Sequence, residues 1–513
     1  MEQTYAVQMS NITKRFGKVV ANDAVDLYIR RGEILSLLGE NGSGKTTLMN
    51  MLSGIYFPDE GQIYVNGQPV TIASPKDAFA CGIGMIHQHF KLVDVFTAVE
   101  NIVLGLEDEG KLDLKSAAAR ITEICRKYGF VIDPFKKVYD MSVSEKQTVE
   151  IVKVLYRGAD ILILDEPTAV LTPQETDRLF DVMRNMKADG KAMVIITHKL
   201  HEVMDVSDRV AVLRKGRYIA DVATKDTSPQ ALTDMMVGHA VTLNIDRPEP
   251  KDPTPRLTVQ DLTVYDAMGV KRLDKVSFTA MGGEILGIAG IAGSGQKELL
   301  EAVAGLQPME EGASILFRPV SGAPEQQLVG KTPLQIKQAG VAMSFVPEDR
   351  LGMGLVGSMG MTGNMLLRSY RKGHGAFTDR KAPRALAEEV KEQLEVMTPS
   401  VNFPVRRLSG GNVQKVLVGR EIAQNPSVLM TAYAVRGLDI NTSYTIYNLL
   451  TEQKMKGVAV IYVGEDLDVL LELCDRILVL CGGQVSGIVD ARTTTKEEVG
   501  LLMTRFAKEG TNG

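Results

Sequence analysis

The sequence repeats itself, and the repeat limits what the chain can fold into. RGEILSLLGENGSGKTTL at Arg31–Leu48 returns as GGEILGIAGIAGSGQKEL at Gly282–Leu299, a displacement of 251 residues from Gly39 to Gly290. SDRVAVLRKGR (Ser207–Arg217) returns as CDRILVLCGGQ (Cys474–Gln484). Each copy opens with a β-rich stretch, reaches a glycine loop, passes through helical segments and ends in apolar strands. The chain is therefore predicted to be a tandem duplication of an α/β domain.

Length and one proline-rich segment indicate where the halves meet. A chain of 513 residues is long enough for more than one domain. The stretch DRPEPKDPTPR (Asp246–Arg256) holds four prolines and several charges, a composition typical of an extended, semi-rigid connector. We predict a first domain over residues 1–240, a linker over 241–256 and a second domain over 257–513.

Composition excludes several classes of protein. Apolar residues make up 44% and charged residues 24%, the profile of a soluble globular protein. A formal net charge of -5 argues against a nucleic-acid binder. The four cysteines lack C-x-x-C spacing and suit a reducing cytoplasm. No signal peptide is expected, and no apolar run reaches the roughly 18 residues of a membrane span. Any membrane role must then pass through partners.

The stretch GENGSGKTT (Gly39–Thr47) fits the phosphate-loop pattern G-x-x-x-x-G-K-[ST]. It follows the apolar strand EILSLL and precedes a helical pattern, which is the context that such a loop needs. Glycines let backbone N–H groups turn toward phosphate oxygens, and the helix start favours anions. Lys45 is expected to reach the terminal phosphates of ATP, and the Thr46 hydroxyl to ligate Mg²⁺. The remaining nucleotide-binding candidates of the loop are Gly39, Asn41, Gly42, Ser43, Gly44 and Thr47.

Two acids follow the apolar run ILIL. Asp165 and Glu166 end a strand that reads as buried on both faces, where unpaired carboxylates are unfavourable unless they have a function. Asp165 is predicted to hold Mg²⁺, and Glu166 to polarise the water that attacks the γ-phosphate. An acid that only caps the next helix is an alternative for Glu166 alone.

Together with three more motifs, these residues resemble the ATP-binding subunits of ABC transporters. The motifs are the signature-like LSGGNVQK (Leu408–Lys415), HQHF at the Q-loop position and IITHKL at the switch-histidine position. The resemblance covers nearly the whole chain. It implies two tandem P-loop ABC ATPase domains, each a mixed β core with a helical subdomain.

The resemblance also implies a head-to-tail sandwich, in which each ATP lies between the phosphate loop of one half and the signature of the other. Gln88 and His198 would then be catalytic, with Gln88 also a Mg²⁺ ligand, and Phe16 would stack on adenine. The second half would contribute Ser409, Gly410, Gly411 and Asp439 to the same ATP.

The two halves differ at several motif positions, and these differences all fall in one of the two composite sites. Gln296, Ala432 and Tyr433 stand where the first half has Lys45, Asp165 and Glu166, and Glu465 stands opposite His198. In the first half the signature is altered, with Ser144 in the place of Gly411. Every one of these losses falls in the site that joins the second phosphate loop to the first signature. One hydrolytic site and one degenerate site are therefore predicted.

The tandem single chain with a Gln at the second loop resembles importers of simple sugars and nucleosides, with the nucleoside branch favoured. That resemblance implies integral-membrane permease subunits as partners, an extracytoplasmic solute-binding protein as an indirect partner, and a peripheral place on the cytoplasmic face of the membrane. No nucleic acid and no direct lipid anchor are expected. Candidate permease contacts are Phe90, Leu92, Val95, Phe96 and the segment Gly354–Leu367. An ordinary place in the core is the alternative for some of these apolar residues.

Two alternative functions predict different sequence features. A soluble tandem ATPase acting on ribosomes or nucleic acid should keep two intact sites and a long charged connector. A DNA-repair or chromosome-type ATPase should insert a coiled coil between phosphate loop and signature, but no sustained heptad run separates Thr47 from Met141. Both fit less well than an importer ATPase.

Overall fold

The structure is a computed structural model that describes most of the chain. The described residues are 5–17, 19–87, 90–106, 113–168, 171–197, 199–238, 245–250, 253–266, 268–291, 293–319, 324–345, 350–370, 378–436 and 438–504. Among them, no helix combines the length and the apolar character needed to cross a bilayer.

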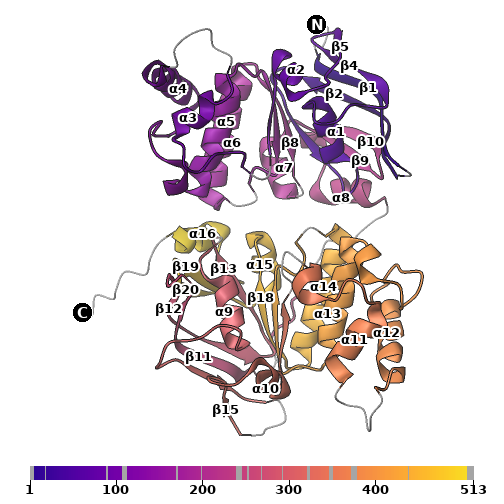
Figure 1. Cartoon of the computed structure of the whole chain (residues 1–513), viewed down its shortest axis with the longest axis vertical. Helices are drawn as coiled ribbons and strands as arrows, with labels where there is room; N and C mark the ends of the chain where they lie inside the picture. The colour runs from indigo at the N-terminus through magenta and orange to yellow at the C-terminus, as the bar shows by residue number, and fades with distance from the viewer. Residues whose placement is uncertain are drawn as a thin grey trace. The chain divides into compact units, whose positions relative to one another are not determined.

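The chain forms two compact units, Met1–Thr242 (unit 1) and Leu243–Gly513 (unit 2). In the described residues each unit has a four-stranded sheet, a six-stranded sheet and a group of helices to one side (Figure 1). The strand orders of the two units match, β2-β1-β4-β5 with β12-β11-β14-β15 and β10-β9-β3-β8-β7-β6 with β20-β19-β13-β18-β17-β16. The duplication read from sequence is thus a duplication of topology.

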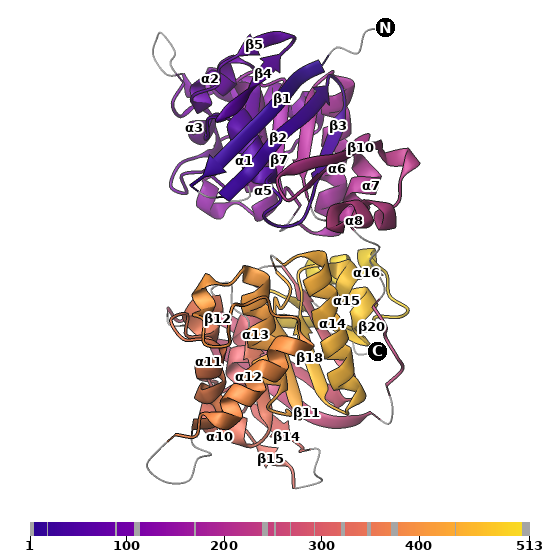
Figure 2. The same ribbon diagram turned by 90° about the vertical axis from the view of Figure 1, so that its right-hand side faces the viewer.

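Unit 1 builds its sheets from ten strands in the described part of the chain. The small sheet is antiparallel, and Figure 2 shows β1 and β2 lying over the larger sheet. The larger sheet is parallel apart from its edge strand β10. The strands are β1 (Tyr5–Phe16), β2 (Val19–Arg30), β3 (Ile34–Leu38), β4 (Glu60–Val65), β5 (Gln68–Val70), β6 (Ile83–Ile86), β7 (Ile161–Asp165), β8 (Ala192–Ile196), β9 (Arg209–Arg214) and β10 (Arg217–Ala223).

The helices of unit 1 divide between the sheets and a separate helical subdomain. Helices α3 to α5 enclose an apolar core of their own, which includes Ile102, Ile121 and Val149. The helices are α1 (Lys45–Leu52), α2 (Pro75–Ala80), α3 (Ala98–Val103), α4 (Leu114–Tyr128), α5 (Val143–Tyr156), α6 (Pro173–Ala188), α7 (Leu200–Val206) and α8 (Pro229–Val237), with 3₁₀ turns at Val138–Asp140 and Thr224–Asp226.

Unit 2 repeats both sheets. Its larger sheet is parallel except at β20, which pairs antiparallel with β19. The strands are β11 (Thr254–Tyr265), β12 (Lys271–Gly282), β13 (Ile285–Gly290), β14 (Ser314–Phe317), β15 (Gln326–Gln327), β16 (Val341–Phe345), β17 (Val428–Ala432), β18 (Ala459–Val463), β19 (Arg476–Cys481) and β20 (Gln484–Asp490).

The helices of unit 2 also include a separately packed group. Helices α11, α12 and α13 surround an apolar core that contains Met361, Val390 and Leu417. The helices are α9 (Gln296–Val303), α10 (Pro333–Gln338), α11 (Met361–Ser369), α12 (Lys381–Gln393), α13 (Gly410–Ile422), α14 (Ile440–Met455), α15 (Leu467–Leu473) and α16 (Lys496–Thr504), with a π-helix at Arg350–Gly354 and a 3₁₀ turn at Val405–Arg407.

The central strands explain where the sites form. Residues Ile161–Leu164 of β7 and all of β17 are buried, as parallel strands covered on both faces require. The loops that carry chemistry leave the carboxyl ends of β3, β6, β7 and β8, so their residues gather at one edge of the sheet. The predicted mixed β core with a helical subdomain is what each unit contains.

Part of the predicted linker belongs to unit 2. Ile245 is buried in the core of that unit, and β11 begins at Thr254. Lys454 donates a hydrogen bond to the Pro248 carbonyl at 2.6 Å, and Arg247 donates to the carbonyls of Leu471 and Cys474. Proline content predicts an extended backbone, but it does not predict which side the segment packs against.

Candidate active site

The phosphate loop of unit 1 connects β3 to α1, and two of its glycines are sterically required. A Cβ on Gly39 would lie 2.2 Å from the Leu213 carbonyl oxygen. A Cβ on Gly44 would lie 2.4 Å from the Ala21 carbonyl oxygen, and the φ of Gly44 is 98°. No side chain caps the start of α1 at Gly44, so its first-turn N–H groups face the loop rather than a capping oxygen. This is the geometry of an anion cradle.

Lys45 lies folded over this loop. Its Nζ donates to the carbonyls of Gly39 at 2.7 Å and of Glu40 at 3.0 Å. Burial lowers the pKa of Lys45, while Glu166, Asp165 and Glu40 oppose that shift. The amine therefore shares one electrostatic environment with both acids of β7.

The surroundings of Asp165 disfavour its ionised form. Burial, followed by the nearby Glu166 carboxylate, raises the pKa of Asp165 to about 6, and Lys45 acts in the opposite direction. Within the described residues, the Ser43 hydroxyl oxygen is buried and has no hydrogen-bond partner. Two crowded carboxylates and an unsatisfied hydroxyl suit a site for a divalent cation with phosphate oxygens.

Glu166 has a left-handed backbone, with φ of 47°, which is unfavourable for a residue with a Cβ. Its N–H donates to the Ile196 carbonyl of β8 at 2.8 Å, and this bond holds the turn. The neighbouring strand thus fixes the direction in which the carboxylate leaves the sheet. An acid that merely caps a helix does not explain this geometry, because the cap of α6 is Thr172.

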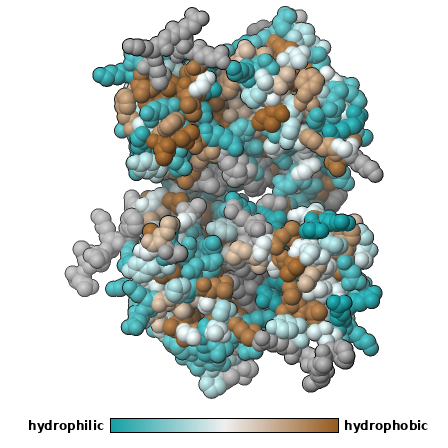
Figure 3. Space-filling model, in the orientation of Figure 1, coloured by the Kyte–Doolittle hydropathy of each residue, from teal (hydrophilic) through white to brown (hydrophobic). Residues whose placement is uncertain are grey.

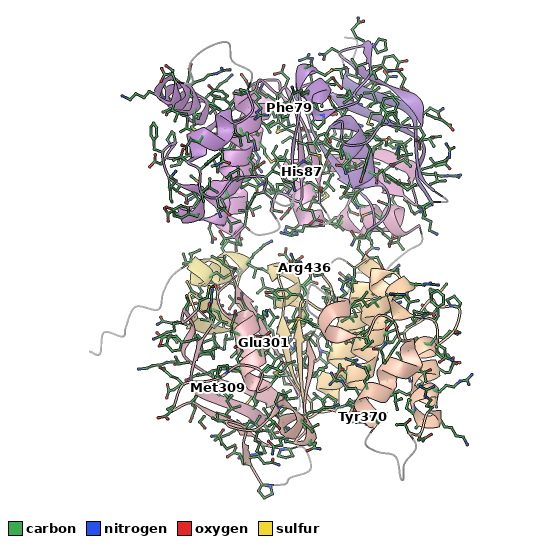
Figure 4. All side chains as sticks on the ribbon, in the orientation of Figure 1. Phe79, His87, Glu301, Met309, Tyr370 and Arg436 are labelled. Atoms are coloured by element: carbon green, nitrogen blue, oxygen red, sulfur yellow. The ribbon has the colours of Figure 1, made fainter. Side chains whose placement is uncertain are left out.

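Two predicted residues, Gln88 and His198, lie outside the described residues. The residues directly before them, His87 and Thr197, are described and come immediately after β6 and β8. His87 follows β6 (Figure 4), and burial together with Lys91 and Lys153 lowers its pKa. Thr197 follows β8 and is buried.

Phe16 ends β1 and is 43% exposed. The ring meets Tyr56 edge-on at 5.2 Å between centroids, and the Lys14 ammonium lies 5.6 Å from its centroid. Tyr56 was not predicted. It follows α1 by a few residues, and the fold brings its ring to the end of β1.

The four signature candidates of unit 2 lie together. Ser409 is the N-cap of α13 and accepts hydrogen bonds from the Asn412 side chain at 2.8 Å and its N–H at 3.4 Å. A Cβ on Gly411 would lie 3.4 Å from the Asp439 carboxylate. Asp439 caps α14 and accepts from the N–H and the hydroxyl of Thr442, both at 2.8 Å. Two helix starts therefore converge on one small-residue surface.

Arg350 is a neighbour of the signature that sequence reasoning missed. A Cβ on Gly410 would lie 2.8 Å from its guanidinium, which also donates to the Arg436 carbonyl. Arg436 (Figure 4) forms an ion pair with Glu465 at 3.4 Å. Nothing in the sequence relates position 350 to position 410, so no local pattern predicts this contact.

The second phosphate loop keeps its shape and loses its charge. Gly293 and Gly295 have φ of 87° and 100°, against 80° and 98° for Gly42 and Gly44. Gln296 takes the place of Lys45, and its amide donates to the Ile291 carbonyl at 3.2 Å. Lys297 points elsewhere and pairs with Glu301 at 3.7 Å, one turn along α9. Adjacent residues of a helix diverge by about 100°, so a lysine one position beyond Gln296 is directed away from the loop.

The altered signature of unit 1 is also structurally intact. Ser142 caps α5 in a capping box with Glu145, and Thr172 caps α6 in another with Glu175. These positions correspond to Ser409 and Asp439. What differs is the loss of glycines, since Val143 and Ser144 stand where unit 2 has Gly410 and Gly411.

The sequence is similar to known proteins along nearly its whole length. Residues 22–169 and 273–431 match the family described as ABC transporter. The nucleoside import ATP-binding protein NupA of Lactococcus lactis is 42% identical over 510 residues, covering 98% of this chain and 99% of that protein. The guanosine import ATP-binding protein NupO of Bacillus subtilis is 42% identical, covering 97% of each. The ribose import ATP-binding protein RbsA 1 of Streptomyces avermitilis is 37% identical, covering 97% of this chain and 93% of that protein.

The family match falls on both halves and the relatives span the whole chain, which confirms the expected fold class. The chain belongs to the ABC transporter family, as an ATPase with two ATP-binding-cassette domains in one polypeptide.

Proposed function

We propose that this ATPase powers an importer of nucleosides or simple sugars, and that it hydrolyses ATP at one composite site. The observation that carries the proposal is the set of charged groups around Lys45. A buried amine, two crowded carboxylates and a glycine cradle meet there, whereas the equivalent loop of unit 2 has a neutral amide.

In the proposed site, the loop N–H groups and Lys45 bind the phosphates, and Phe16 stacks on the adenine. The remaining loop contacts are assigned to Gly39, Asn41, Gly42, Ser43, Gly44, Thr46 and Thr47. Ser409, Gly410, Gly411 and Asp439 of the second half complete it, as the family resemblance implies. Their small side chains and the start of α13 suit a γ-phosphate.

Glu166 is proposed to orient and polarise the attacking water, with Gln88 and His198 as its catalytic partners. The left-handed backbone at Glu166 supports this role because it holds the carboxylate in one fixed direction. Catalysis of this type depends mainly on positioning and on electrostatic stabilisation.

The residues present fit Mg²⁺. Thr46, Gln88 and Asp165 are assigned to hold it, and the raised pKa of Asp165 supports the assignment because a nearby cation would favour the ionised form. When bound, Mg²⁺ neutralises charge on the phosphates.

The partners are proposed to be integral-membrane permeases, with a solute-binding protein acting through them, at the cytoplasmic face of the membrane. Val95 is 64% exposed, and Phe90, Leu92 and Phe96 are partly exposed, as a contact surface needs. Segment Gly354–Leu367 is the corresponding surface of unit 2, where Met359 and Leu367 are exposed.

A nucleoside is the favoured cargo, because two relatives at 42% identity are named for nucleoside and guanosine import and the ribose importer stands at 37%. Uptake of radiolabelled guanosine and ribose by cells with and without this chain tests that preference. Uptake of ribose but not guanosine would reverse it.

The central test is Glu166→Gln in the transporter purified with its permeases. We expect ATP hydrolysis to fall by about 10²–10⁴-fold while ATP binding persists. Tyr433→Phe, at the corresponding position of unit 2, is the matched control and should leave hydrolysis near wild type. Normal hydrolysis by Glu166→Gln would overturn the assignment.

A further inference from the structure

The first turn of α13 in unit 2 carries no apolar side chain. Ser409 is its N-cap, Gly410, Gly411 and Asn412 follow, and the first buried residue of the helix is Val413. Figure 3 shows hydrophobic side chains gathered over the helices of unit 2, but this turn contributes none of them. Polar and backbone contacts therefore set the position of the turn, whose N–H groups are assigned to the γ-phosphate.

Two such contacts join the turn to the loop that follows β17. The Gln414 amide is fully buried and donates to the Ala434 carbonyl at 2.5 Å. A Cβ on Gly411 would lie 3.4 Å from the Asp439 carboxylate, so the helix start and the loop approach closely there. Neither of these contacts involves Gly410, which lies between the cap and Gly411.

Arg350 supplies the contact at Gly410. Its Nη1 atom would lie 2.8 Å from a Cβ on Gly410, and its Nη2 atom donates to the Arg436 carbonyl in the loop after β17 (Figure 4). The planar guanidinium thus lies between the helix start and the loop, with one nitrogen toward each. Burial and the charge of Arg436 lower the pKa of Arg350, and no carboxylate of the described residues forms an ion pair with it. An arginine in such surroundings does not stabilise the fold through an ion pair, which favours a role at the helix start.

The segment that carries this arginine is longer than its counterpart in unit 1. Ile83 and Val341 begin the corresponding strands β6 and β16. The N–H groups of Val93 and Val356 each donate to an Asn side chain of the following helix, at 2.7 and 2.8 Å, so these two residues also correspond. Ten positions separate Ile83 from Val93 and fifteen separate Val341 from Val356, so unit 2 has five more residues here. The π-helix Arg350–Gly354 has five residues, and π-helical turns are frequent at functional sites.

The other end of the π-helix is fixed to the same helix α13. Arg420, which is 4% exposed, donates to the Gly354 carbonyl at 2.9 Å. The Nε atoms of Arg420 and Arg368 lie 2.8 and 2.9 Å from the same Glu421 oxygen, and this cluster holds the Arg420 guanidinium in place. A Cβ on Gly354 would lie 2.9 Å from the Leu417 side chain. The arginine at the start of the π-helix is therefore carried on a segment anchored to the helix that it contacts.

We propose that Arg350 is a positioning residue for ATP hydrolysis, which holds the start of α13 where Gly410 and Gly411 complete the composite site. The inference rests on the proposed function and adds a residue to its site. Hydrogen-bond donors stabilise a transferring phosphoryl group only where they are correctly placed, and a displacement of about 1 Å can reduce the rate about 100-fold. Arg350 acts through Gly410 and the Arg436 carbonyl, without touching the phosphate.

Arg350→Ala tests this role in the transporter purified with its permeases. We expect kcat for ATP hydrolysis to fall about 10- to 100-fold, because the helix start is no longer fixed. The affinity for ADP should stay within about twofold of wild type, since ADP lacks the phosphate that the signature is assigned to contact. Vanadate, which mimics the transferring phosphoryl group, should inhibit more weakly by the factor by which kcat falls. The thermal unfolding midpoint reports whether the variant folds, and a loss of stability alone would not give this pattern.

Arg350→Lys separates positioning from direct charge. A lysine keeps the charge but has one nitrogen, so it cannot contact Gly410 and the Arg436 carbonyl at once. We expect its kcat to stay within about threefold of the Arg350→Ala value. Recovery of most of the wild-type kcat would overturn the positioning role. Arg318→Ala, which removes an exposed arginine of unit 2 that pairs with Glu325, is the control and should leave kcat unchanged.

The outcomes also separate this inference from the proposed function. A wild-type kcat in a folded Arg350→Ala transporter would overturn the positioning role and leave the proposed hydrolytic site standing. Equal losses of kcat and of ADP affinity would overturn it as well, because the change would then act on the phosphate loop. Normal hydrolysis by Glu166→Gln in the same assay would overturn the site, and the inference with it.

Discussion

Glu166 and Tyr433 have the same left-handed backbone, with φ of 47° and 53°, at corresponding points of the two halves. Each N–H donates to the last residue of the adjacent strand, Ile196 at 2.8 Å and Val463 at 2.9 Å. A bulky aromatic residue gains nothing from this conformation. Unit 2 therefore keeps the turn that carries the proposed catalytic acid in unit 1, although it has no acid at that position.

The retained loop shape predicts that unit 2 still binds nucleotide. Tyr265 ends β11 and is 36% exposed, and the Lys271 ammonium lies 5.8 Å from its ring centroid, much as Lys14 lies near Phe16. Trapping of radiolabelled ATP with Mg²⁺ on the Glu166→Gln transporter should give two nucleotides per chain, the second bound more weakly. A single nucleotide per chain would mean that unit 2 is kept for its signature and its permease contact.

The missing charge of that loop can be restored. Gln296→Lys should tighten binding at the second loop about 5- to 100-fold, because an amine to phosphate bond is charge-assisted. Hydrolysis there should not appear, since Ala432 and Tyr433 supply no acid. Lys297→Ala is the control and should change neither quantity, because Lys297 pairs with Glu301. Binding is measured by calorimetry on a chain whose first loop carries Lys45→Ala.

Asp165 predicts a pH dependence of stability in the protein without nucleotide. The pKa of Asp165 is raised to about 6 in the folded protein, so the folded state binds this proton more tightly than the unfolded state does. The contribution of the protonated carboxyl to the free energy of unfolding is fully present below the unfolded pKa and is lost as pH rises through about 6. Asp165→Asn should therefore be more stable than wild type at pH 7, by roughly 1–2 kcal/mol, and the difference should vanish near pH 4. Denaturant unfolding of unit 1 at both pH values measures this. If Asp165→Asn and wild type had the same free energy of unfolding at both pH values, the raised pKa of Asp165 would be contradicted.

Lys454 predicts a large effect on the stability of unit 2. Its side chain is fully buried, and its amine donates to the Asp475 carboxylate at 2.8 Å as well as to Pro248. Lys454→Met leaves the buried Asp475 carboxylate paired with Arg492. We expect it to lower the free energy of unfolding by about 3–5 kcal/mol. Lys496→Met, which breaks an exposed pair with Asp468 in the same unit, should cost less than about 1 kcal/mol. Equal effects would show that the buried pair contributes no more than a surface one.

Local patterns predicted most of the fold and the first half of the site. The phosphate loop and the β7 acids could be read because each is a short stretch with its own spacing, and the tandem repeat gave the architecture. The sequence does not predict Tyr56, Arg350 or the Arg368–Glu421–Arg420 cluster, because each of them contacts a residue that is distant in the sequence. The linker shows the same limit, since its prolines do not reveal that Ile245 is a core residue of unit 2.

The two side chains that close the phosphate loops differ in one further respect. The Gln296 amide bonds the Ile291 carbonyl and needs no counter-charge, whereas the Lys45 amine is desolvated beside two acids whose repulsion it only partly offsets. An empty phosphate loop is therefore electrostatically unfavourable in the first half, whereas it leaves no buried charge on Gln296 in the second. A duplicated topology thus holds two phosphate loops with different electrostatic requirements.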